Sequence, residues 1–419
     1  MRRFRIVLLL ACVSAPQISS ASPLELYGFG SRSSAMAGVG VATCTSFDCV
    51  FLNPGRLARQ RRKTLSAGYT YGDINLTING NKSNSDNTQA TTFGIVVPLK
   101  LGASLADRIT LGLGMMVPRN AIARARSPVV GTPSFALLDS RSEVVGIQLA
   151  LGYAWNEHVG FGVGVLVSGT LTGRILVDVD GAGRFITRSE QELKSNFTPV
   201  LGASLESSDK VGATARHRYG ISLRGASEAG YDIQIDNNLA ASLPLSLPQL
   251  LVVGVPQYDP ASIVLEFGYQ ATSELGLEFQ LDYKRWSAFP LPTENPIERG
   301  DNLAGANFHD TVVPRMGVEW LSGTTGAQLA LRAGYSFIYS PAPEMTGQAS
   351  LLDNHRHVGS AGLGISWPEA SHGLRFDMWI QEHRLLDRKH EKTDPESELG
   401  TIRSEGGIRI GGVSVGVNL

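Results

Sequence analysis

The sequence lacks a long apolar run after its first residues, an excess of charge of either sign, and more than a few cysteines. Without a long apolar run we expect no transmembrane helix. The 37 Lys and Arg residues balance 38 Asp and Glu residues, so no basic surface for nucleic acid is predicted. The three cysteines have no histidine cluster beside them, so no metal site is expected. The composition thus excludes a helical membrane protein and a nucleic-acid partner.

The first residues have the pattern of a secretory signal peptide. Three arginines within the first five residues precede a short apolar core, Ile6 to Val13, and small residues then predict cleavage after Ala21. A lipoprotein signal ending at Cys12 is the alternative, but it would leave only about five apolar residues before the cysteine. We therefore expect residues 1–21 to be a signal peptide and the mature chain to leave the cytoplasm.

Alternation of apolar and polar residues is the main signal in the rest of the chain. It is clearest from Glu274 to Lys284, where one parity carries Leu275, Leu277, Phe279, Leu281 and Tyr283 and the other carries Glu278, Gln280, Asp282 and Lys284. A strand places successive side chains on opposite faces. Repeated along a secreted chain, this pattern predicts a β-barrel of the outer membrane, apolar towards lipid and polar towards the lumen.

Fourteen segments have this pattern, so residues 59–419 are expected to form an all-β, fourteen-stranded antiparallel transmembrane barrel. The segments are 64–78, 89–104, 107–117, 141–154, 158–178, 184–206, 209–235, 262–272, 274–286, 311–322, 326–338, 355–367, 371–384 and 401–419. Splitting 209–235 would give fifteen strands. Because bacterial barrels use an even number, one long strand bent at Gly225 is favoured.

Short and long connections alternate between these segments. The long ones, expected outside the cell, are 118–140, 236–261, 287–310, 339–354 and 385–400. Trp155, Trp320 and Trp367 lie beside short turns and Trp286 at the opposite end of its strand, which predicts two aromatic girdles. Trp379 falls on the lumenal parity.

Residues 22–58 do not alternate and are rich in small residues, which is typical of a plug packed inside the lumen; we call this segment the hatch. Asn53, Pro54 and Gly55 are expected to hold it to the periplasmic side of the wall, because proline fixes one backbone angle and glycine permits a close approach. Cys44 and Cys49 are expected to form a disulfide outside the cytoplasm. Two free buried thiols or a metal site are the alternatives.

Two of the long loops carry apolar side chains that could capture a hydrophobic solute from water. We expect a capture surface that includes Phe135, Leu137, Leu138, Leu247, Leu250 and Leu251. The alternative is that these residues pack against one another as a cap.

Lumenal cations are candidates for holding a carboxylate head group. Lys284, Arg332 and Arg375 have the inward parity, beside Trp379. The favoured alternative is a ladder of ion pairs with Glu266, Glu278, Asp282 and Asp377, which share that face. Pro118 ends the third strand and marks either a kink in the wall or an ordinary strand end.

Three stretches resemble the FadL/TodX family of outer-membrane transporters for long-chain fatty acids and hydrocarbons. They are L-N-P-G-R-L-A at 52–58, Y-K-R-W-S-A-F at 283–289, and L-R-A-G-Y-S-F-I-Y-S-P-A-P at 331–343 followed by the strand that runs to 364. Gly55 and Arg56 stand where the family often has Ala and Gly. The resemblance implies a fourteen-stranded barrel with a lumenal hatch and passive uptake of apolar molecules, which leave sideways through a kink in the third strand.

The expected function is therefore passive uptake of fatty acids or other hydrophobic compounds across the outer membrane of a Gram-negative bacterium. No catalytic residue and no cofactor are predicted. The expected partners are the hydrophobic solute, outer-membrane lipid and the barrel assembly machinery, and the protein is expected to be a monomer. A general porin is one alternative, and an outer-membrane hydrolase is another, although no catalytic triad could be assembled from the sequence.

Overall fold

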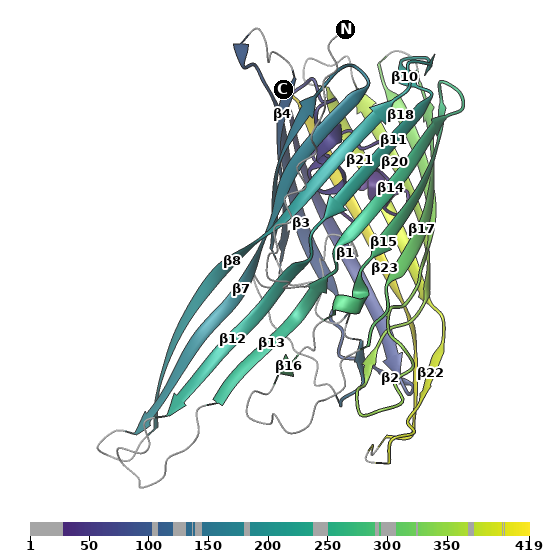
Figure 1. The fold of residues 1–419 in the computed structure, drawn as a ribbon. Helices are drawn as coiled ribbons and strands as arrows, with labels where there is room; N and C mark the ends of the chain where they lie inside the picture. The colour runs from purple at the N-terminus through teal and green to yellow at the C-terminus, as the bar shows by residue number, and fades with distance from the viewer. Residues whose placement is uncertain are drawn as a thin grey trace, which may run out of the picture.

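The computed structural model describes residues 28–102, 108–119, 131–135, 137–138, 145–179, 185–237, 250–289, 293–294, 307–323, 326–367, 373–395, 397 and 399–419. These residues form one closed antiparallel barrel, and residues 28–58 of the hatch lie inside it (Figure 1). No helix in this part of the chain is long and apolar enough to cross a membrane. The expected signal peptide, residues 1–21, lies outside the described residues.

The barrel wall contains fourteen strands, as the alternation predicted. They are β1 (Thr64–Ile78), β3 (Thr88–Leu99), β4 (Ile109–Pro118), β6 (Gly146–Ala154), β7 (Val159–Val179), β8 (Phe185–Glu206), β11 (His217–Arg224), β14 (Ser262–Gln270), β15 (Leu275–Lys284), β17 (Thr311–Ser322), β18 (Gln328–Ile338), β20 (Arg356–Trp367), β21 (Leu374–Leu385) and β23 (Thr401–Asn418). Each pairs with its neighbour, and β1 closes the wall against β23, from Thr64↔Asn418 to Ile78↔Ser404.

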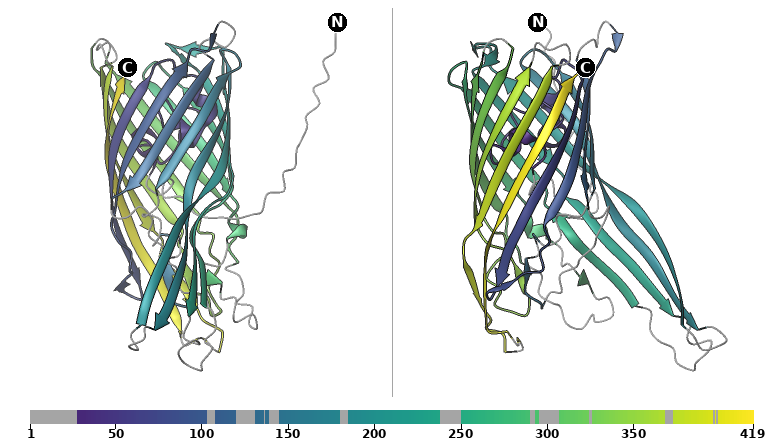
Figure 2. Two further views of the ribbon diagram at one scale, coloured as in Figure 1. Left: turned by 90° about the vertical axis from the view of Figure 1, so that its left-hand side faces the viewer. Right: turned by 180° about the vertical axis from the view of Figure 1, so that it is seen from behind.

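The remaining elements are short or lie outside the wall. They are the hatch helices α2 (Ser31–Ser34), α3 (Cys49–Leu52) and α4 (Pro54–Leu57), the 3-10 turn η2 (Trp286–Ala288), and the strands β2 (Asn81–Lys82), β5 (Ser134–Phe135), β9 (Lys210–Val211), β10 (Thr214–Ala215), β12 (Ser227–Asn237), β13 (Leu250–Asp259), β16 (Thr293–Glu294), β19 (Leu351–Leu352) and β22 (Arg388–Glu391). The hatch lies in the half of the barrel that also holds the C-terminus and the short turns (Figures 1 and 2).

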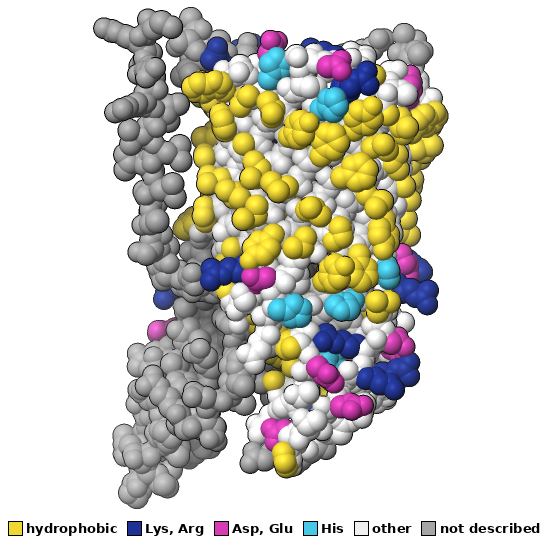
Figure 3. Space-filling view, turned by 45° about the vertical axis from the view of Figure 1, so that its right-hand side comes forward, with side chains coloured by type: hydrophobic (Ala, Val, Ile, Leu, Met, Phe, Trp, Pro, Cys, Tyr) yellow, Lys and Arg dark blue, Asp and Glu magenta, His cyan; other side chains and the backbone are white. Residues whose placement is uncertain are grey.

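The outer face of the wall is an apolar band with charged residues at both ends (Figure 3). On β15, for example, Phe279 and Leu281 are about half exposed while Glu278 and Gln280 are buried inside. Trp155, Trp320 and Trp367 are exposed beside short turns, as expected of one girdle. The expectation for Trp286 was wrong, because η2 turns its side chain into a packed cluster of loop residues, where it is 5% exposed.

The predicted single strand 209–235 was also wrong. The wall strand β11 ends at Arg224, where the Gly225 N–H donates to Pro199 O, and the chain then crosses β8 and β7. Beyond this point β12 pairs in parallel with β7, from Tyr231↔Leu171 onwards, because the pairing of β6 with β7 stops at Ile147↔Val167 and leaves that edge free.

A second strand, β13, pairs with β12, so part of the loop expected at 236–261 is a hairpin. Strands β7, β8, β12 and β13 extend past the rim as an arm (Figures 1 and 2). The arm lies at the end opposite the hatch, which is the extracellular end if the short turns face the periplasm.

Candidate functional site

The hatch is attached to the wall at Asn53, Pro54 and Gly55. The Asn53 side-chain amide donates to Val41 O at 2.7 Å and to Ala203 O at 2.9 Å, and its oxygen accepts from the Gly55 N–H at 2.9 Å. This capping geometry starts α4, with Pro54 at its first position. The three residues expected to hold the hatch therefore lie together against β6, β7 and β8.

Gly55 has backbone of the wall on both sides. A Cβ at this position would lie 2.9 Å from Gly202 O and from Ala203 Cα, closer than real Cβ atoms approach, and 3.0 Å from Gly160 O. The Ser204 hydroxyl donates to Gly55 O at 3.1 Å. Only glycine fits this contact, which accounts for its use where the resembling family often has alanine.

A second attachment lies on the opposite wall and is ionic. Arg32 of α2 donates to Glu278 at 2.6 Å and to Glu319 at 2.8 Å, and all three side chains are largely buried. Glu266 accepts from the backbone N–H groups of Gly40 and Val41. Glu266 and Glu278 have the inward parity noted in the sequence, whereas Glu319 was not considered, and the contact of all three with the hatch was not predicted. The only signal was the charge of Arg32 among small, uncharged residues of the hatch.

Of the three lumenal cations expected to attract a carboxylate, Arg332 and Arg375 are paired with protein carboxylates. Arg332 donates to Glu319 and to Asp377, each at 2.7 Å, and Arg375 lies 2.6 Å from Asp377. This arrangement is the ladder of ion pairs that the sequence favoured as the alternative. Lys284 is buried and lines a small lumenal cavity of about 50 Å³, which lies between the hatch and the extracellular loops.

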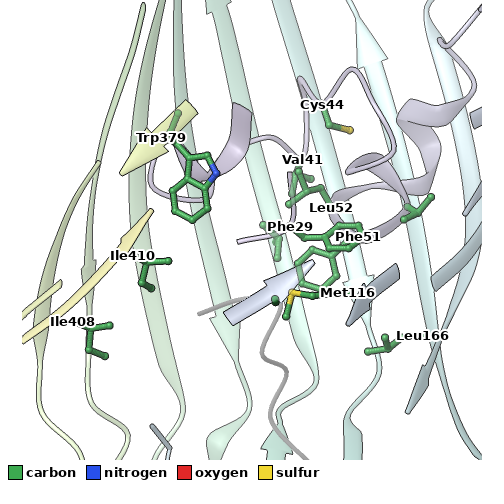
Figure 4. Close-up of a cluster of buried hydrophobic side chains, with 14 of the residues drawn as sticks. Phe29, Val41, Cys44, Phe51, Leu52, Met116, Leu166, Trp379, Ile408 and Ile410 are labelled. Carbon is green, nitrogen blue, oxygen red and sulfur yellow. The ribbon is translucent and has the colours of Figure 1, made fainter. Parts of the chain in front are cut away.

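The lumen is divided into two sectors of different character. The charged groups gather on β14, β15, β17, β18 and β21, whereas the inner faces of β23, β1, β3 and β4 are uncharged and combine apolar side chains with glycine, serine and threonine. The apolar sector joins the wall to the hatch and to the loops in one cluster, whose members include Phe29, Phe51, Ile74, Leu76, Val96, Met116, Phe135, Leu138, Trp379, Ile402, Ile408 and Ile410. In Figure 4, Trp379, Ile408 and Ile410 lie on one side of the lumen, and Phe29, Phe51 and Met116 lie on the other. Trp379 is thus lumenal, as its parity indicated.

The extracellular mouth is covered by a second apolar cluster, which we call the cap. It contains Leu137, Tyr258, Trp286, Phe308, Ala342, Met345 and Leu351. Tyr258 packs on Trp286 with ring centroids 5.3 Å apart, and Phe289 stacks on Phe308 at 4.4 Å. These residues come from four different connections between strands, so the extracellular loops pack together in the cap.

The capture residues expected in the loops are not exposed where the structure describes them. Phe135 is 0% exposed and Leu138 1%, both in the apolar sector, and Leu137 is 4% exposed in the cap. Packing as a cap, the alternative interpretation, describes them better than an open surface. Leu247 lies outside the described residues. Leu250 and Leu251 belong to β13 rather than to a loop, and their side chains are not described.

A polar cavity of about 260 Å³ separates the hatch from β1, β21 and β23 at the periplasmic end. Ser31, Asp48 and Arg375 line it. Burial raises the pKa of Asp48, although its carboxylate accepts from the Ser46 N–H at 3.1 Å. Nearby, Cys44 and Cys49 are joined by a disulfide with Cα atoms 5.4 Å apart, which closes a small loop of the hatch.

The third strand shows no kink at Pro118. Strand β4 pairs with β3 along its whole length, from Leu99↔Ile109 to Ala90↔Pro118, and with β6 as far as Met116↔Gly146. Pro118 is simply the last residue of its strand, as the second interpretation of this proline expected. Among the described residues, no three His, Cys, Asp or Glu side chains are grouped so that they could hold a metal ion.

Comparison with known proteins gives one family and several related folds. A family described as "Outer membrane protein transport protein (OMPP1/FadL/TodX)" matches residues 10–378. No curated protein sequence matches the chain significantly.

Three solved structures have a similar fold. The Pseudomonas aeruginosa FadL homologue is 14% identical, with 96% of this chain and 99% of that chain covered and a TM-score of 0.62. The P. putida toluene transporter TodX is 14% identical, with coverage of 94% and 99% and a TM-score of 0.58. The CymD monoaromatic hydrocarbon channel is 15% identical, with coverage of 94% and 98% and a TM-score of 0.55.

Proposed function

The chain belongs to the family of outer membrane protein transport proteins (OMPP1/FadL/TodX), and from this premise we propose that it carries hydrophobic compounds passively across the outer membrane of a Gram-negative bacterium. The apolar sector of the lumen supports this most directly, because it runs from the extracellular loops to the hatch as one cluster. A general porin has a polar, water-filled lumen. Transfer from water to such a sector is worth roughly 0.8 kcal/mol per methylene, so the transport needs no catalytic residue and no energy source.

The solute is captured at the extracellular mouth. The cap and the adjoining Phe135 and Leu138 hold apolar and aromatic side chains from several loops. If these loops move apart, the apolar side chains that now pack against one another become the two walls of a groove. Apolar concavities of this kind are the default binding sites for small ligands. We propose the same capture role for Leu247, Leu250 and Leu251, of which the last two belong to β13.

The substrate class is a hydrophobic compound, either a fatty acid or a hydrocarbon. Two similar structures are those of a toluene transporter and a monoaromatic hydrocarbon channel, and another is that of a FadL homologue. The cations Arg332 and Arg375 are already paired, so a carboxylate would have to displace Asp377 or Glu319 to reach them. Mass spectrometry of ligands that co-purify with the protein in mild detergent would identify the compound.

The test is uptake of toluene and of oleate by cells that produce variants of the apolar sector. Ile408→Ser with Ile410→Ser puts two hydroxyls into this sector, and we expect slower uptake of whichever solute the wild type carries. Val200→Ser is the matched control, because Val200 is equally buried at 1% but lies on β8, outside the apolar cluster. Equal uptake by the double variant and the control, with both inserted as heat-modifiable barrels, would contradict the proposed path.

A general porin is the second candidate function, and conductance separates the two. The hatch fills the lumen and is attached at two walls, so we expect no large, steady channels in a planar bilayer. We further propose that the protein is a monomer inserted by the barrel assembly machinery, with outer-membrane lipid around the apolar band.

A further inference from the structure

A run of cations lies at the periplasmic end of the barrel, in the segment that joins the hatch to the wall. This segment follows α4, which ends at Leu57, and leads to β1, which begins at Thr64. Residues 59–63 of the segment have the sequence Arg-Gln-Arg-Arg-Lys. The charges of the whole chain nearly cancel, so four cations within five positions are a local concentration of positive charge.

The segment follows the rim of the wall. The Arg59 guanidinium donates to Asn156 O at 3.2 Å and to Glu157 O at 2.6 Å, in the turn between β6 and β7. Gln60 O accepts from the Thr110 hydroxyl at 3.3 Å, near the start of β4. The segment therefore crosses the periplasmic ends of the wall strands, from the β6–β7 turn past β4 to β1.

The turn between β3 and β4 adds two cations to the same part of the rim. Lys100 follows β3, which pairs with β1 from Thr64↔Val96, and Arg108 precedes β4. Both side chains are exposed. We call the exposed cations of this part of the chain the basic rim, which consists of Arg61, Arg62, Lys63, Lys100 and Arg108.

Most of the positive charge of the basic rim is not neutralised by the protein. Among the described residues, no carboxylate forms an ion pair with Arg62, Lys63, Lys100 or Arg108. The nearby carboxylate of Glu206 is bound by Arg56, and that of Glu157 lies 3.6 Å from His158. The basic rim therefore attracts an anion from outside the chain.

Apolar side chains lie beside the basic rim. Trp155, next to the residues that accept from Arg59, is 62% exposed, and Leu65 and Leu101 are about half exposed. An exposed tryptophan at the end of a barrel strand lies at the level of the lipid head groups. We therefore expect the neighbouring cations at the level of the head groups of the inner leaflet.

We propose that the basic rim is a binding site for an anionic phospholipid in the inner leaflet of the outer membrane. The guanidinium and ammonium groups bind the phosphate, and the acyl chains lie along the apolar wall beside Leu65 and Trp155. The site selects one class of lipid at one place, whereas the rest of the apolar band accepts any lipid. This inference is independent of the solute that the protein carries.

The test measures which lipid lies next to Trp155. The protein is reconstituted in phosphatidylcholine vesicles that contain a rising fraction of phosphatidylglycerol with brominated acyl chains, because bromine quenches tryptophan emission. Comparison with Trp155→Phe isolates the quenching of Trp155. The quenching of Trp320, which is exposed at the same end on β17, is isolated in the same way as an internal reference. Brominated phosphatidylcholine at the same fractions is the reference lipid.

We expect half-maximal quenching of Trp155 at a much lower fraction of the brominated phosphatidylglycerol than of the brominated phosphatidylcholine, and no such difference for Trp320. Each cation near an anionic lipid surface contributes a factor of about five in binding, so Arg62→Ser with Lys63→Ser should raise the required fraction by up to about 25-fold. The matched control is Lys210→Ser with Arg216→Ser. It removes two cations at the same end of the barrel, between β8 and β11, and should keep the wild-type preference.

Salt gives a second measurement that needs no variant. Raising the ionic strength from about 0.1 M to about 1 M shortens the Debye length from about 10 Å to about 3 Å, so the preference for phosphatidylglycerol should fall. Equal quenching of Trp155 by the two brominated lipids, or a preference that neither salt nor the loss of Arg62 and Lys63 reduces, would overturn the proposal. Absence of a lipid preference together with binding to peptidoglycan sacculi that the double variant loses would also overturn it, and would assign the basic rim to a periplasmic polymer.

Discussion

Removing the Asn53 side chain should release the hatch from the wall. This amide makes three hydrogen bonds, two as donor and one as acceptor, and the residue is 0% exposed. Asn53→Ala removes all three and leaves Val41 O and Ala203 O buried without this donor. No water can replace it without opening the contact between α4 and β8.

The expected loss of attachment follows from typical hydrogen-bond energies. Only the bond to Ala203 O joins the hatch to the wall, because Val41 and Gly55 belong to the hatch itself. Its loss leaves Ala203 O buried without this donor, which should cost about 1–3 kcal/mol of docking free energy and raise the undocked population by roughly 5- to 150-fold. Asn53→Asp keeps the acceptor for the Gly55 N–H but loses both donors and buries a charge, so its effect should be at least as large as that of Asn53→Ala.

Conductance in planar bilayers measures this directly. We expect Asn53→Ala to show frequent openings and the wild type to stay closed. Deletion of residues 24–50 should set the upper limit of conductance. Asn75→Ala is the control, because Asn75 is exposed on β1 and far from the hatch attachment. If both Asn53→Ala and the deletion conduct no more than the wild type, the hatch does not plug the lumen.

Three further changes test other contacts. Glu278→Gln should weaken the ionic attachment of Arg32 and raise the rate of hatch opening, whereas the exposed Glu157→Gln should not; equal conductance for the two would refute the role of this ion pair. Phe135→Ala should lower the free energy of unfolding of the barrel by about 3 kcal/mol or more, because the ring is fully buried. The change is measured from heat-modifiable mobility on a gel, and a loss below about 1 kcal/mol would mean that the ring packs loosely. Acid should loosen the cap. Burial lowers the pKa of His390 to about 4, and its neutral Nδ1 accepts a hydrogen bond from the Met345 N–H at 3.0 Å. The stability that His390 contributes is therefore complete above the pKa of the unfolded state, about 6.5, and is lost as the pH falls through about 4. The emission of Trp286, which packs in the same cap, should shift over that range in the wild type and not in His390→Gln; the same shift in both would exclude His390 as the cause.

The wall strands could be predicted from the sequence because each must present apolar residues to lipid. The bounds predicted for 64–78 and 311–322 are those of β1 and β17. The segment 209–235 was misread because parity constrains only the number of strands and not where the chain leaves the wall. The break after Arg224 depends on contacts with Pro199 and on the free edge of β7, which are properties of the folded barrel.

The hatch attachment was predictable in part. The sequence Asn-Pro-Gly predicts the start of a helix and a close approach between two backbone segments, and these residues do lie against the barrel wall. The partners of Arg32 could not be found, because Glu278 and Glu319 lie on strands more than two hundred residues away and only the closed barrel brings them together. The burial of Trp286 was missed, and that of Phe135 was only the alternative interpretation, for a related reason: loop packing leaves no periodic pattern in the sequence.

Paired uptake of an apolar and a polar solute tests the central claim most directly. Cells with the protein should take up labelled toluene or oleate faster than cells without it, both before and after the proton gradient is removed, and should take up a hydrophilic sugar no faster. An equal increase for the sugar would indicate a general porin. No increase for either hydrophobic solute, or an increase that disappears with the proton gradient, would contradict passive transport through the apolar sector.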